Sequence, residues 1–414
     1  MNESAPNYAV LLLILGVVTL ASAVVRVELR RLHLPAMAGY ILIGVALSAS
    51  DTLTGFMTEG LRQNLDFLAK IGVVILLFRV GLESDLSLLA RQLRNAATIW
   101  LPNMVLPAVA AFLLVYFWPG YGLLNALFVA VAASATSIGV STAVWEEAGQ
   151  LKTPTGALLV DAAELDDISA VILLSVLFAL VPVLRDAVDG SLWITALSAG
   201  GLQFGKLVIF CAGCYFFSRW LEKTVTAWFA EFDKRLGPLL FAVGATFLIA
   251  AAADILGFSM AIGALFAGLA FSRDPAEQDI DRSFAGLFAV FAPYFFVAIG
   301  LAIDITTVGT ALWMTLALLA VVVLGKLIGA GIPAALLTSR RDGLLISVSM
   351  VPRAEIYLIV LLHGVNLGAW AIPKELYTAG VIVSLLTCIG SPVVVQRLLA
   401  SKADVAEERT GEAG

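Results

Sequence analysis

The sequence predicts an all-helical protein that crosses a membrane many times. Hydrophobic residues make up 60% of its 414 positions, and charged residues make up only 14%. Soluble domains carry about a quarter charged residues, so this composition lies outside their range. Apolar stretches long enough to span a bilayer recur from one end of the chain to the other. The net charge of −6 says little about partners, because membrane orientation follows the placement of Lys and Arg.

A membrane-length window places about thirteen spans along the chain. The first apolar segment is long, and basic residues follow it instead of preceding it, so we expect a true span and no cleavable signal peptide. The predicted spans cover residues 8–25, 35–50, 65–84, 97–117, 121–144, 155–184, 192–218, 236–254, 256–272, 284–303, 309–337, 343–365 and 375–399.

The loops between these spans predict the orientation. If the N-terminus lies outside, nearly all loop Lys and Arg residues fall on the inner side, and the outer loops keep only Arg62, Arg185 and Lys374. Cytoplasmic loops of membrane proteins carry such an excess of basic residues. We therefore expect an odd number of spans, with the N-terminus outside and the C-terminus in the cytoplasm.

Residues 1–400 are predicted to form one transmembrane domain made of two halves. The segment 219–235 mixes Trp220, Trp228 and Phe229 with charges of both signs, which is typical of an amphipathic helix lying on a membrane surface. We take it as the divider between the halves. Residues 401–414 form a short, polar and charged tail that we expect to be disordered and cytosolic.

Two of the predicted spans look broken. Small and hydroxyl residues dominate the fifth from Ala132 to Thr142, and the twelfth places Pro352 with two charges in mid-span. Interrupted helices at corresponding places in two halves indicate the binding site of a transporter. Taken separately, each would instead indicate a proline kink or a packing face of small residues.

The sixth span contains four carboxylates, Asp161, Glu164, Asp166 and Asp167. An acid at bilayer depth is costly, which makes it a functional-site hypothesis unless the run is a helix end wetted by water. Asp166 and Asp167 are adjacent and point about 100° apart on a helix, so they have different roles. Glu164 shares a face with Asp167. Glu164 and Asp161 lie nearer the cytosol, where they either line a funnel that attracts cations or are solvated structural charges.

Basic residues also fall inside predicted spans. Lys326 is flanked by apolar residues and needs a counter-charge, for which one aspartate is the simplest choice; Lys206 is a weaker rival as that partner. Arg353 and Glu355 either pair with each other or cap the ends of a broken helix. The Arg79 side chain either extends to the membrane surface or contacts Glu83, one helical turn later.

Other chemistry is not indicated. Cys211 and Cys214 form a CxxC without a second pair, which favours small core residues over a metal site. The glycines around Lys326 lack the spacing of a phosphate loop, so we expect no nucleotide chemistry, no cofactor, no nucleic-acid binding and no enzymatic activity.

Short motifs occur in a specific order along the membrane region. They are LPAMAGYILIG at 34–44, LLFRVGLE at 76–83, ATS at 135–137, IGALFAG at 262–268, FFVAIG at 295–300 and VPRAE at 351–355. In this order they resemble the bacterial monovalent cation/proton antiporters of the second cation/proton antiporter group, which are relatives of sodium/proton exchangers and potassium efflux systems.

The resemblance implies residue roles. Asp167 would be the ion-binding carboxylate, with Thr136 and Ser137 of the broken span as further ion-binding residues. Asp166 would be the neighbour that pairs with a basic residue, for which Lys326 is the candidate. The Asp-Asp pair is similar to electrogenic sodium/proton members, whereas potassium efflux relatives usually carry Gln-Asp and electroneutral exchangers Asn-Asp.

It also implies an architecture and a function. We expect an inverted repeat of about five helices in each half, two broken helices that cross near the site, and a homodimer in the bacterial cell membrane. The expected activity is the exchange of Na⁺, or of Li⁺ or K⁺, for protons. A potassium/proton antiporter, a cation channel and a membrane sensor subunit remain as alternatives. Arg79, Tyr357 and the additional acids Asp161 and Glu164 depart from the family pattern.

Overall fold

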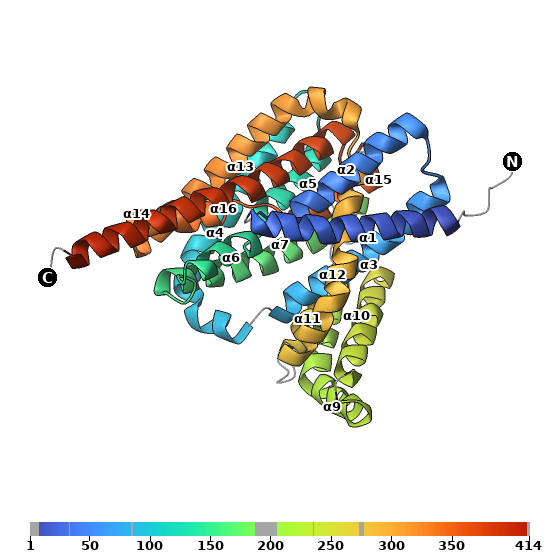
Figure 1. Cartoon of the computed structure of the whole chain (residues 1–414), viewed down its shortest axis with the longest axis horizontal. Coiled ribbons are helices and arrows are strands. Elements are labelled where there is room, and N and C mark those ends of the chain that lie inside the picture. Colours follow the sequence, from blue (N-terminus) through green and yellow to red (C-terminus); the bar gives the residue numbers. More distant parts are fainter. Residues whose placement is uncertain are drawn as a thin grey trace. The chain divides into compact units, whose positions relative to one another are not determined.

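Each described stretch of the chain is mainly helical. The computed structural model describes residues 8–32, 34–83, 86–186, 205–234, 236–272 and 277–411 (Figure 1). Residues 205–216 are also helical. The elements are α1 (Tyr8–Arg31), α2 (Ala36–Thr54), α3 (Glu59–Glu83), α4 (Leu86–Tyr116), α5 (Leu123–Ser134), α6 (Gly139–Glu147), α7 (Pro154–Asp186), η2 (Phe217–Leu221), α9 (Glu222–Phe232), α10 (Gly237–Ile255), α11 (Met260–Phe271), α12 (Glu277–Leu301), η3 (Ile305–Thr307), α13 (Val308–Leu337), α14 (Arg340–Ser349), α15 (Glu355–Leu367) and α16 (Lys374–Gly411).

These helices confirm the predicted class of membrane protein. Each predicted span lies on a helix or a pair of helices, except that residues 192–204 of the seventh span lie outside the described part of the chain. Within the described residues, eight segments are long and apolar enough to cross a membrane. The other predicted spans fall on helices that carry several charges, such as α7, or on short apolar helices such as α11.

The chain forms two compact units that interleave along the sequence. Unit 1 comprises residues 1–25, 39–86 and 175–302, and unit 2 comprises residues 26–38, 87–174 and 303–414. Each unit takes segments from both sides of 219–235, so the spatial division differs from the division into sequential halves. The two repeat halves stay a prediction.

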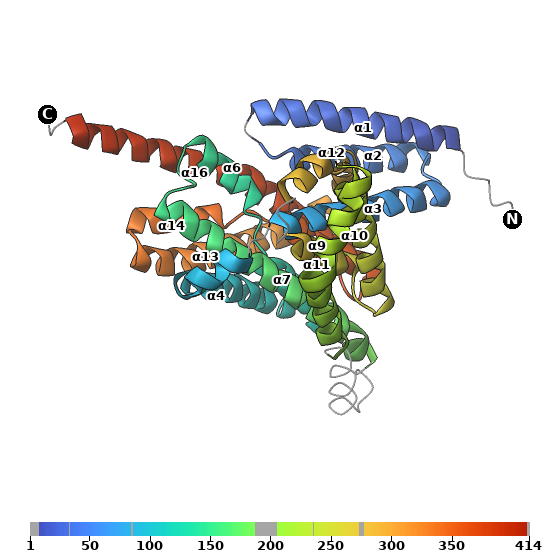
Figure 2. The same cartoon turned by 90° about the horizontal axis from the view of Figure 1, so that it is seen from below.

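Unit 1 is built around very close helix contacts. Helix α3 lies against α11 and α12 (Figure 2). Gly81 of α3 meets Gly268 of α11, and Gly44 of α2 meets Gly300 of α12, each so closely that a Cβ atom would overlap the facing backbone. These four glycines of the sequence motifs therefore serve close helix packing.

In unit 2, α13 packs against α14 and α16, and α5 packs against α15 (Figure 1). Helix α4 carries Pro102 and Pro107 in its interior and also approaches α13 closely. This approach is possible because Gly329 faces Pro102 and Gly325 faces Pro107, where a Cβ would collide with the backbone of α4. The two glycines flank Lys326, so they bring α4 next to that residue.

The predicted amphipathic segment is helical. It forms η2 and α9, on which Trp220 and Trp228 are exposed while Glu222 and Thr226 are buried. The hydroxyl of Thr226 donates to Glu222 at 2.8 Å. Its last residue, at position 235, lies outside the described part of the chain. Contact of this segment with a membrane surface stays a prediction.

The structure differs from our expectation at the C-terminal end. Helix α16 continues to Gly411, where we expected a disordered tail from residue 401. Residues 401–410 contain no Gly or Pro and include Ala, Glu, Lys and Arg, which favour helix. Residues 412–414 lie outside the described part.

Candidate ion-binding site

The two broken helices meet in unit 2. Helix α5 ends at Ser134 and α6 begins at Gly139, whereas α14 ends at Ser349 and α15 begins at Glu355. Between them, the backbone N–H of Ser137 donates to the carbonyl of Pro352 at 3.0 Å. The two unwound stretches therefore lie against each other, and four helix ends converge on one region.

A row of side chains on α16 holds the second break. The hydroxyl of Ser384 and the thiol of Cys388 donate to the Arg353 carbonyl, the latter at 3.2 Å, and the Arg353 N–H donates to Thr387 Oγ1 at 3.3 Å. Ser391 donates to a carbonyl of the last turn of α14 at 2.7 Å. These bonds replace the helical ladder that Pro352 and the unwinding remove. We name Ser384, Thr387, Cys388 and Ser391 the α16 clasp.

Helix α6 is fastened to the same break. Ser141 donates from its hydroxyl to the Ser349 carbonyl at 2.8 Å, and Trp145 donates from its indole N–H to the Ser349 hydroxyl at 2.9 Å. Both side chains are fully buried. Sequence reasoning missed these residues and the α16 clasp, although hydroxyls at positions 384, 387 and 391 recur at helical spacing.

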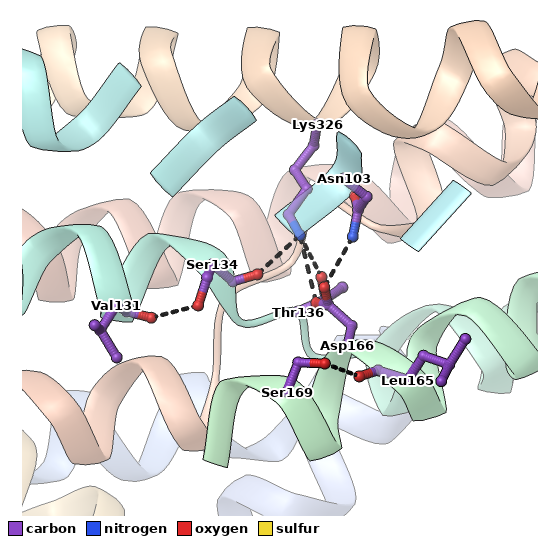
Figure 3. A network of polar contacts seen from close by, with 8 residues as sticks. All are labelled: Asn103, Val131, Ser134, Thr136, Leu165, Asp166, Ser169 and Lys326. Atoms are coloured by element: carbon purple, nitrogen blue, oxygen red, sulfur yellow. Dashed lines mark hydrogen bonds and ion pairs between the residues drawn. The ribbon is translucent and has the colours of Figure 1, made fainter. Parts of the chain in front are cut away.

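Asp166 is completely buried and is held through both of its oxygens (Figure 3). Asn103 Nδ2 of α4 donates to Asp166 Oδ1 at 3.1 Å, and Lys326 Nζ of α13 lies 3.4 Å from Asp166 Oδ2. The structure thus brings Lys326 to the aspartate for which we predicted a basic partner. We did not predict Asn103 as a partner of Asp166, because the two residues are 63 positions apart and no pattern in the sequence relates them.

Lys326 has further partners in the first break. Its Nζ donates to Thr136 Oγ1 at 2.6 Å and to the Ser134 carbonyl at 3.1 Å (Figure 3). The Ser134 carbonyl belongs to the C-terminal end of α5, which favours positive charge. With Asp166 these contacts engage all three N–H groups of the ammonium. Full burial of a Lys–Asp pair is costly unless such additional hydrogen bonds satisfy it.

Asp167 is in a different environment. Its side chain is partly exposed, and within the described residues no protein group hydrogen-bonds its carboxylate. It interacts electrostatically with Asp166, Glu355, Glu164 and Lys326. The neighbouring aspartates therefore differ, as predicted from their angular separation: Asp166 is enclosed with a partner on each oxygen, whereas Asp167 is partly exposed and has no hydrogen bond among the described residues.

Glu355 and Arg353 do not form the pair that we considered. Glu355, in the first turn of α15, accepts a hydrogen bond from the Ser137 hydroxyl at 2.6 Å. Arg353 is fully buried, and its guanidinium nitrogens have no hydrogen-bond partner among the described residues. The Ser137 hydroxyl and the N-terminal end of α15 both stabilise the negative charge of Glu355. They therefore supply the contacts that we had considered for Arg353.

The two additional acids also differ from each other. Glu164 is partly exposed, as a residue near an aqueous entrance would be. Asp161 is only 8% exposed, and its Oδ2 has no partner among the described residues. Asp161 is therefore more enclosed than Glu164, and the accessory role of both acids near the inner mouth stays a prediction.

Two other span cations considered above, Lys206 and Arg79, lie in unit 1. Lys206 approaches the Leu256 carbonyl at 3.5 Å, and the Arg79 guanidinium lies 4.9 Å from the ring centre of Phe288. Lys326 is thus the lysine that the structure places on Asp166, and the cation–π contact of Arg79 was not predicted.

Comparisons with known proteins bear on the family of the chain. A family model described as "Sodium/hydrogen exchanger, transmembrane" matches residues 16–401. An Enterococcus hirae Na⁺/H⁺ antiporter is 30% identical over 399 residues, covering 94% of this chain and 96% of its own. The Na⁺/H⁺-K⁺ antiporter GerN of Bacillus cereus is 28% identical, with 90% and 92% covered, and the K⁺/H⁺ antiporter subunit KhtU of Bacillus subtilis is 28% identical, with 80% and 79% covered.

A solved structure is similar in fold. The sodium proton antiporter MjNhaP1 of Methanocaldococcus jannaschii superimposes with a TM-score of 0.69 at 15% sequence identity, over 95% of this chain and 98% of that chain. At this identity the likeness supports the fold, and the site has to be argued from the contacts above.

Proposed function

Because the chain belongs to the transmembrane sodium/hydrogen exchanger family and is a cation/proton antiporter, we propose that it exchanges Na⁺ for protons at Asp167. The observation that carries this assignment is the contrast between the two aspartates. Asp166 already has partners on both oxygens, whereas Asp167 is partly exposed and free of hydrogen bonds within the described residues. An arriving ion therefore finds one available carboxylate.

The surroundings of Asp167 suit a small cation. Interrupted helices offer unwound backbone carbonyls and hydroxyls as ligands at mid-membrane. Thr136 and Ser137 are the hydroxyl residues of the first break, and both are already engaged, one by Lys326 and one by Glu355. Their hydroxyl oxygens retain acceptor capacity, so they can also contact an ion.

Exchange follows from competition for one carboxylate. Asp167 holds either a proton or a Na⁺ ion, and the site faces each side of the membrane in turn. If the site changes sides only when it is occupied, a proton entering on one side drives Na⁺ out on the other. The reverse gradient drives the reverse flux.

The number of protons per cycle depends on Lys326. If only Asp167 exchanges its proton, one proton moves for each Na⁺ and no net charge crosses. If Lys326 also releases a proton when Na⁺ arrives, two protons move and the exchange is electrogenic. We propose the second scheme for this protein, because Lys326 is fully buried and lies against Asp166, next to Asp167 in the sequence.

Potassium is the second candidate ion. Two similar relatives carry K⁺ in their names, which motivates a direct comparison of the ions. We further propose that the N-terminus lies outside, that the C-terminus is cytoplasmic, and that the protein acts as a homodimer in a bacterial cell membrane.

The test is ion exchange by the purified chain in proteoliposomes that contain a pH-sensitive dye. Na⁺, Li⁺ and K⁺ are added in turn, with and without a clamped membrane voltage. We expect proton movement with Na⁺ and a rate that changes with voltage. A rate that does not depend on voltage would instead support the exchange of one proton for each Na⁺. Failure to accumulate Na⁺ against its gradient when a proton gradient is imposed would indicate a channel, which cannot perform that work.

A further inference from the structure

Elements η2 and α9 pack on the rest of unit 1 by one face (Figure 1). The Ser218 hydroxyl of η2 donates to the Ala270 carbonyl of α11 at 2.9 Å. On α9, the ring of Phe229 stacks on that of Phe241 of α10, with ring centres 5.2 Å apart. Gly237, the first residue of α10, lies so close to the Phe229 carbonyl that a Cβ there would overlap it. The segment is therefore a fixed part of unit 1 and has a defined outer face.

Three large aromatic side chains stand on this outer face. Trp220, Trp228 and Phe232 are each more than half exposed, and we name them the aromatic face. The rings of Trp228 and Phe232 contact each other, with centres 4.8 Å apart, so they form one continuous apolar surface. In membrane proteins, Trp side chains gather where the lipid headgroups meet the acyl chains. The aromatic face therefore fits the headgroup region of a bilayer.

Two basic side chains, Arg219 and Lys223, border the aromatic face. We name them the basic pair; they are four residues apart, so they lie on the same side of the segment, about one turn from each other. Both are exposed, and neither has an ion pair or a hydrogen bond among the described residues. Like charges at this spacing destabilise a helix, so the basic pair does not serve the stability of the segment itself.

The acidic residues of the segment do not neutralise the basic pair. Glu222 lies between the two cations in the sequence, but it is completely buried and accepts a hydrogen bond from buried Thr226 at 2.8 Å. Glu231 and Asp233 are exposed, but they lie about two helical turns or more beyond the basic pair. The whole chain has a net charge of −6, so its total charge repels anions. The attraction for an anion is therefore local to this pair.

We propose that Arg219 and Lys223 bind the phosphate of an anionic phospholipid, such as phosphatidylglycerol, whose acyl chains lie along the aromatic face. A guanidinium donates two parallel hydrogen bonds to a phosphate, and an ammonium adds a point charge. A lipid supplies a phosphate together with apolar chains, whereas a free phosphate ion supplies only the first. The rings beside the basic pair therefore favour a lipid as the occupant. The bound lipid fixes α9, and through it α10, at the membrane surface. This site does not depend on the proposed ion exchange.

The test measures the melting temperature of the purified full chain in detergent as lipid is added. Phosphatidylglycerol and phosphatidylcholine with the same acyl chains are compared, and the retained lipid is identified by native mass spectrometry. We expect phosphatidylglycerol to raise the melting temperature at a lower concentration than phosphatidylcholine does, because a bound ligand stabilises the folded state. This preference should shrink at high ionic strength, since the basic pair is exposed. Inorganic phosphate added with phosphatidylcholine should give no further rise. A rise with phosphate as large as that with phosphatidylglycerol would overturn the lipid as occupant.

Arg219→Gln combined with Lys223→Gln should remove the preference. Each basic residue beside an anionic lipid strengthens binding roughly fivefold, so the phosphatidylglycerol concentration at the midpoint should rise by about tenfold or more. Arg26→Gln combined with Arg30→Gln is the matched control. These two arginines of α1 are also exposed, four residues apart and without an ion pair among the described residues, but α1 contains no Trp or Phe. The control should keep most of the preference.

Three results would overturn the proposal: no preference in the wild-type protein, a wild-type preference in the variant of the basic pair, or an equal loss in both double variants. The last would mean that any two exposed cations attract the lipid. Arg219→Lys keeps the charge and should keep most of the preference. If the variant of the basic pair gives too little folded protein, Lys223→Gln alone carries the same test with an effect of roughly fivefold.

Discussion

At the scale of single residues, the two neighbouring aspartates show how surroundings divide one chemistry into two roles. They have the same side chain and are consecutive on α7, yet only Asp166 is enclosed by donors from other helices. A carboxylate with satisfied oxygens is a poor ligand for an arriving ion, and an open one is a good ligand. The role of each follows from its position around the helix axis.

Asp167→Asn should abolish sodium-dependent proton movement, because a neutral amide takes up no proton near neutral pH and lacks the negative charge for which Na⁺ and the proton compete. The variant should still fold, since no hydrogen bond within the described residues depends on the Asp167 carboxylate. Proteoliposome exchange and size-exclusion chromatography measure the two properties. Near wild-type exchange by this variant would mean that another group carries the ion.

The contact between Asp166 and Lys326 predicts strong coupling in stability. Removing one member leaves the other charge buried, which costs about 3–5 kcal/mol. Asp166→Asn and Lys326→Met should therefore each lower the melting temperature in detergent, and the double variant should recover part of the loss. Strictly additive losses would argue against a functional contact between them.

At the scale of helices, helix breaks and small residues determine which elements come together. Glycines allow α3 to touch α11 and α4 to touch α13, and Pro352 opens α14–α15 so that α16 can hold the freed carbonyls. The glycines and Pro352 act through packing and backbone shape. They bring Asn103, Lys326 and the breaks to the place where binding is possible.

Gly268→Ala tests the packing of α3 against α11. A Cβ at Gly268 would overlap the Phe78 carbonyl, so the backbones must separate. We expect a loss of about 1–3 kcal/mol in stability, as for other overpacked sites. Gly286→Ala in α12 is the matched control: a Cβ there meets nothing, and the change should stabilise the helix by up to about 1 kcal/mol. Equal melting temperatures for both variants would contradict the packing argument.

Asp304 links the start of η3 to α16 outside the membrane-spanning segments. Hydrogen bonds from Thr306, followed by that from Lys374 at 3.1 Å, hold the pKa of Asp304 below its usual value. A carboxyl with a lowered pKa in the folded state adds stability above its unfolded pKa of about 3.9 and loses it as the pH falls through the folded value. Asp304→Asn should therefore lower the melting temperature at pH near 7, with a difference from wild type that shrinks on acidification. A difference that does not vary with pH would contradict this linkage.

At the scale of the whole molecule, the membrane spans and the two breaks could be predicted because they depend on local sequence. Hydropathy defines the spans, and Pro352 or a run of small residues defines a break. The carboxylates of α7 stand out for the same reason, since charge is costly in an apolar segment. These are properties of short stretches of sequence, so they can be recognised without knowledge of the fold.

The rest of the site depends on contacts between distant segments. Asn103 lies in an ordinary apolar helix, and only the packing of α4 on α13 brings it to Asp166. Arg353 and Glu355 look like a pair in the sequence, but the hydroxyl of Ser137, from the first break, donates to the glutamate instead. The interleaving of the two units was also out of reach, because segment order does not state which segments pack together.

The placement of basic residues makes one prediction for the molecule in its membrane. A green fluorescent protein fused to the C-terminus should fluoresce in a bacterial host, because that protein matures in the cytoplasm, where we place this end. A fusion of alkaline phosphatase at the same position should be inactive. The opposite pair of results would reverse the orientation and the direction assigned to each face of the site.

The α16 clasp has a consequence for how the protein tolerates change. Its four side chains occupy one face of the last long helix and support the backbone of the second break without facing an ion. In a genetic screen for growth in high salt, substitutions at these positions, which recur every third or fourth residue, should nevertheless impair growth. Substitutions of the carboxylates should have a similar effect. We therefore expect a variant that loses a clasp hydroxyl to fail because the backbone of the second break loses its support, and not because an ion ligand is missing.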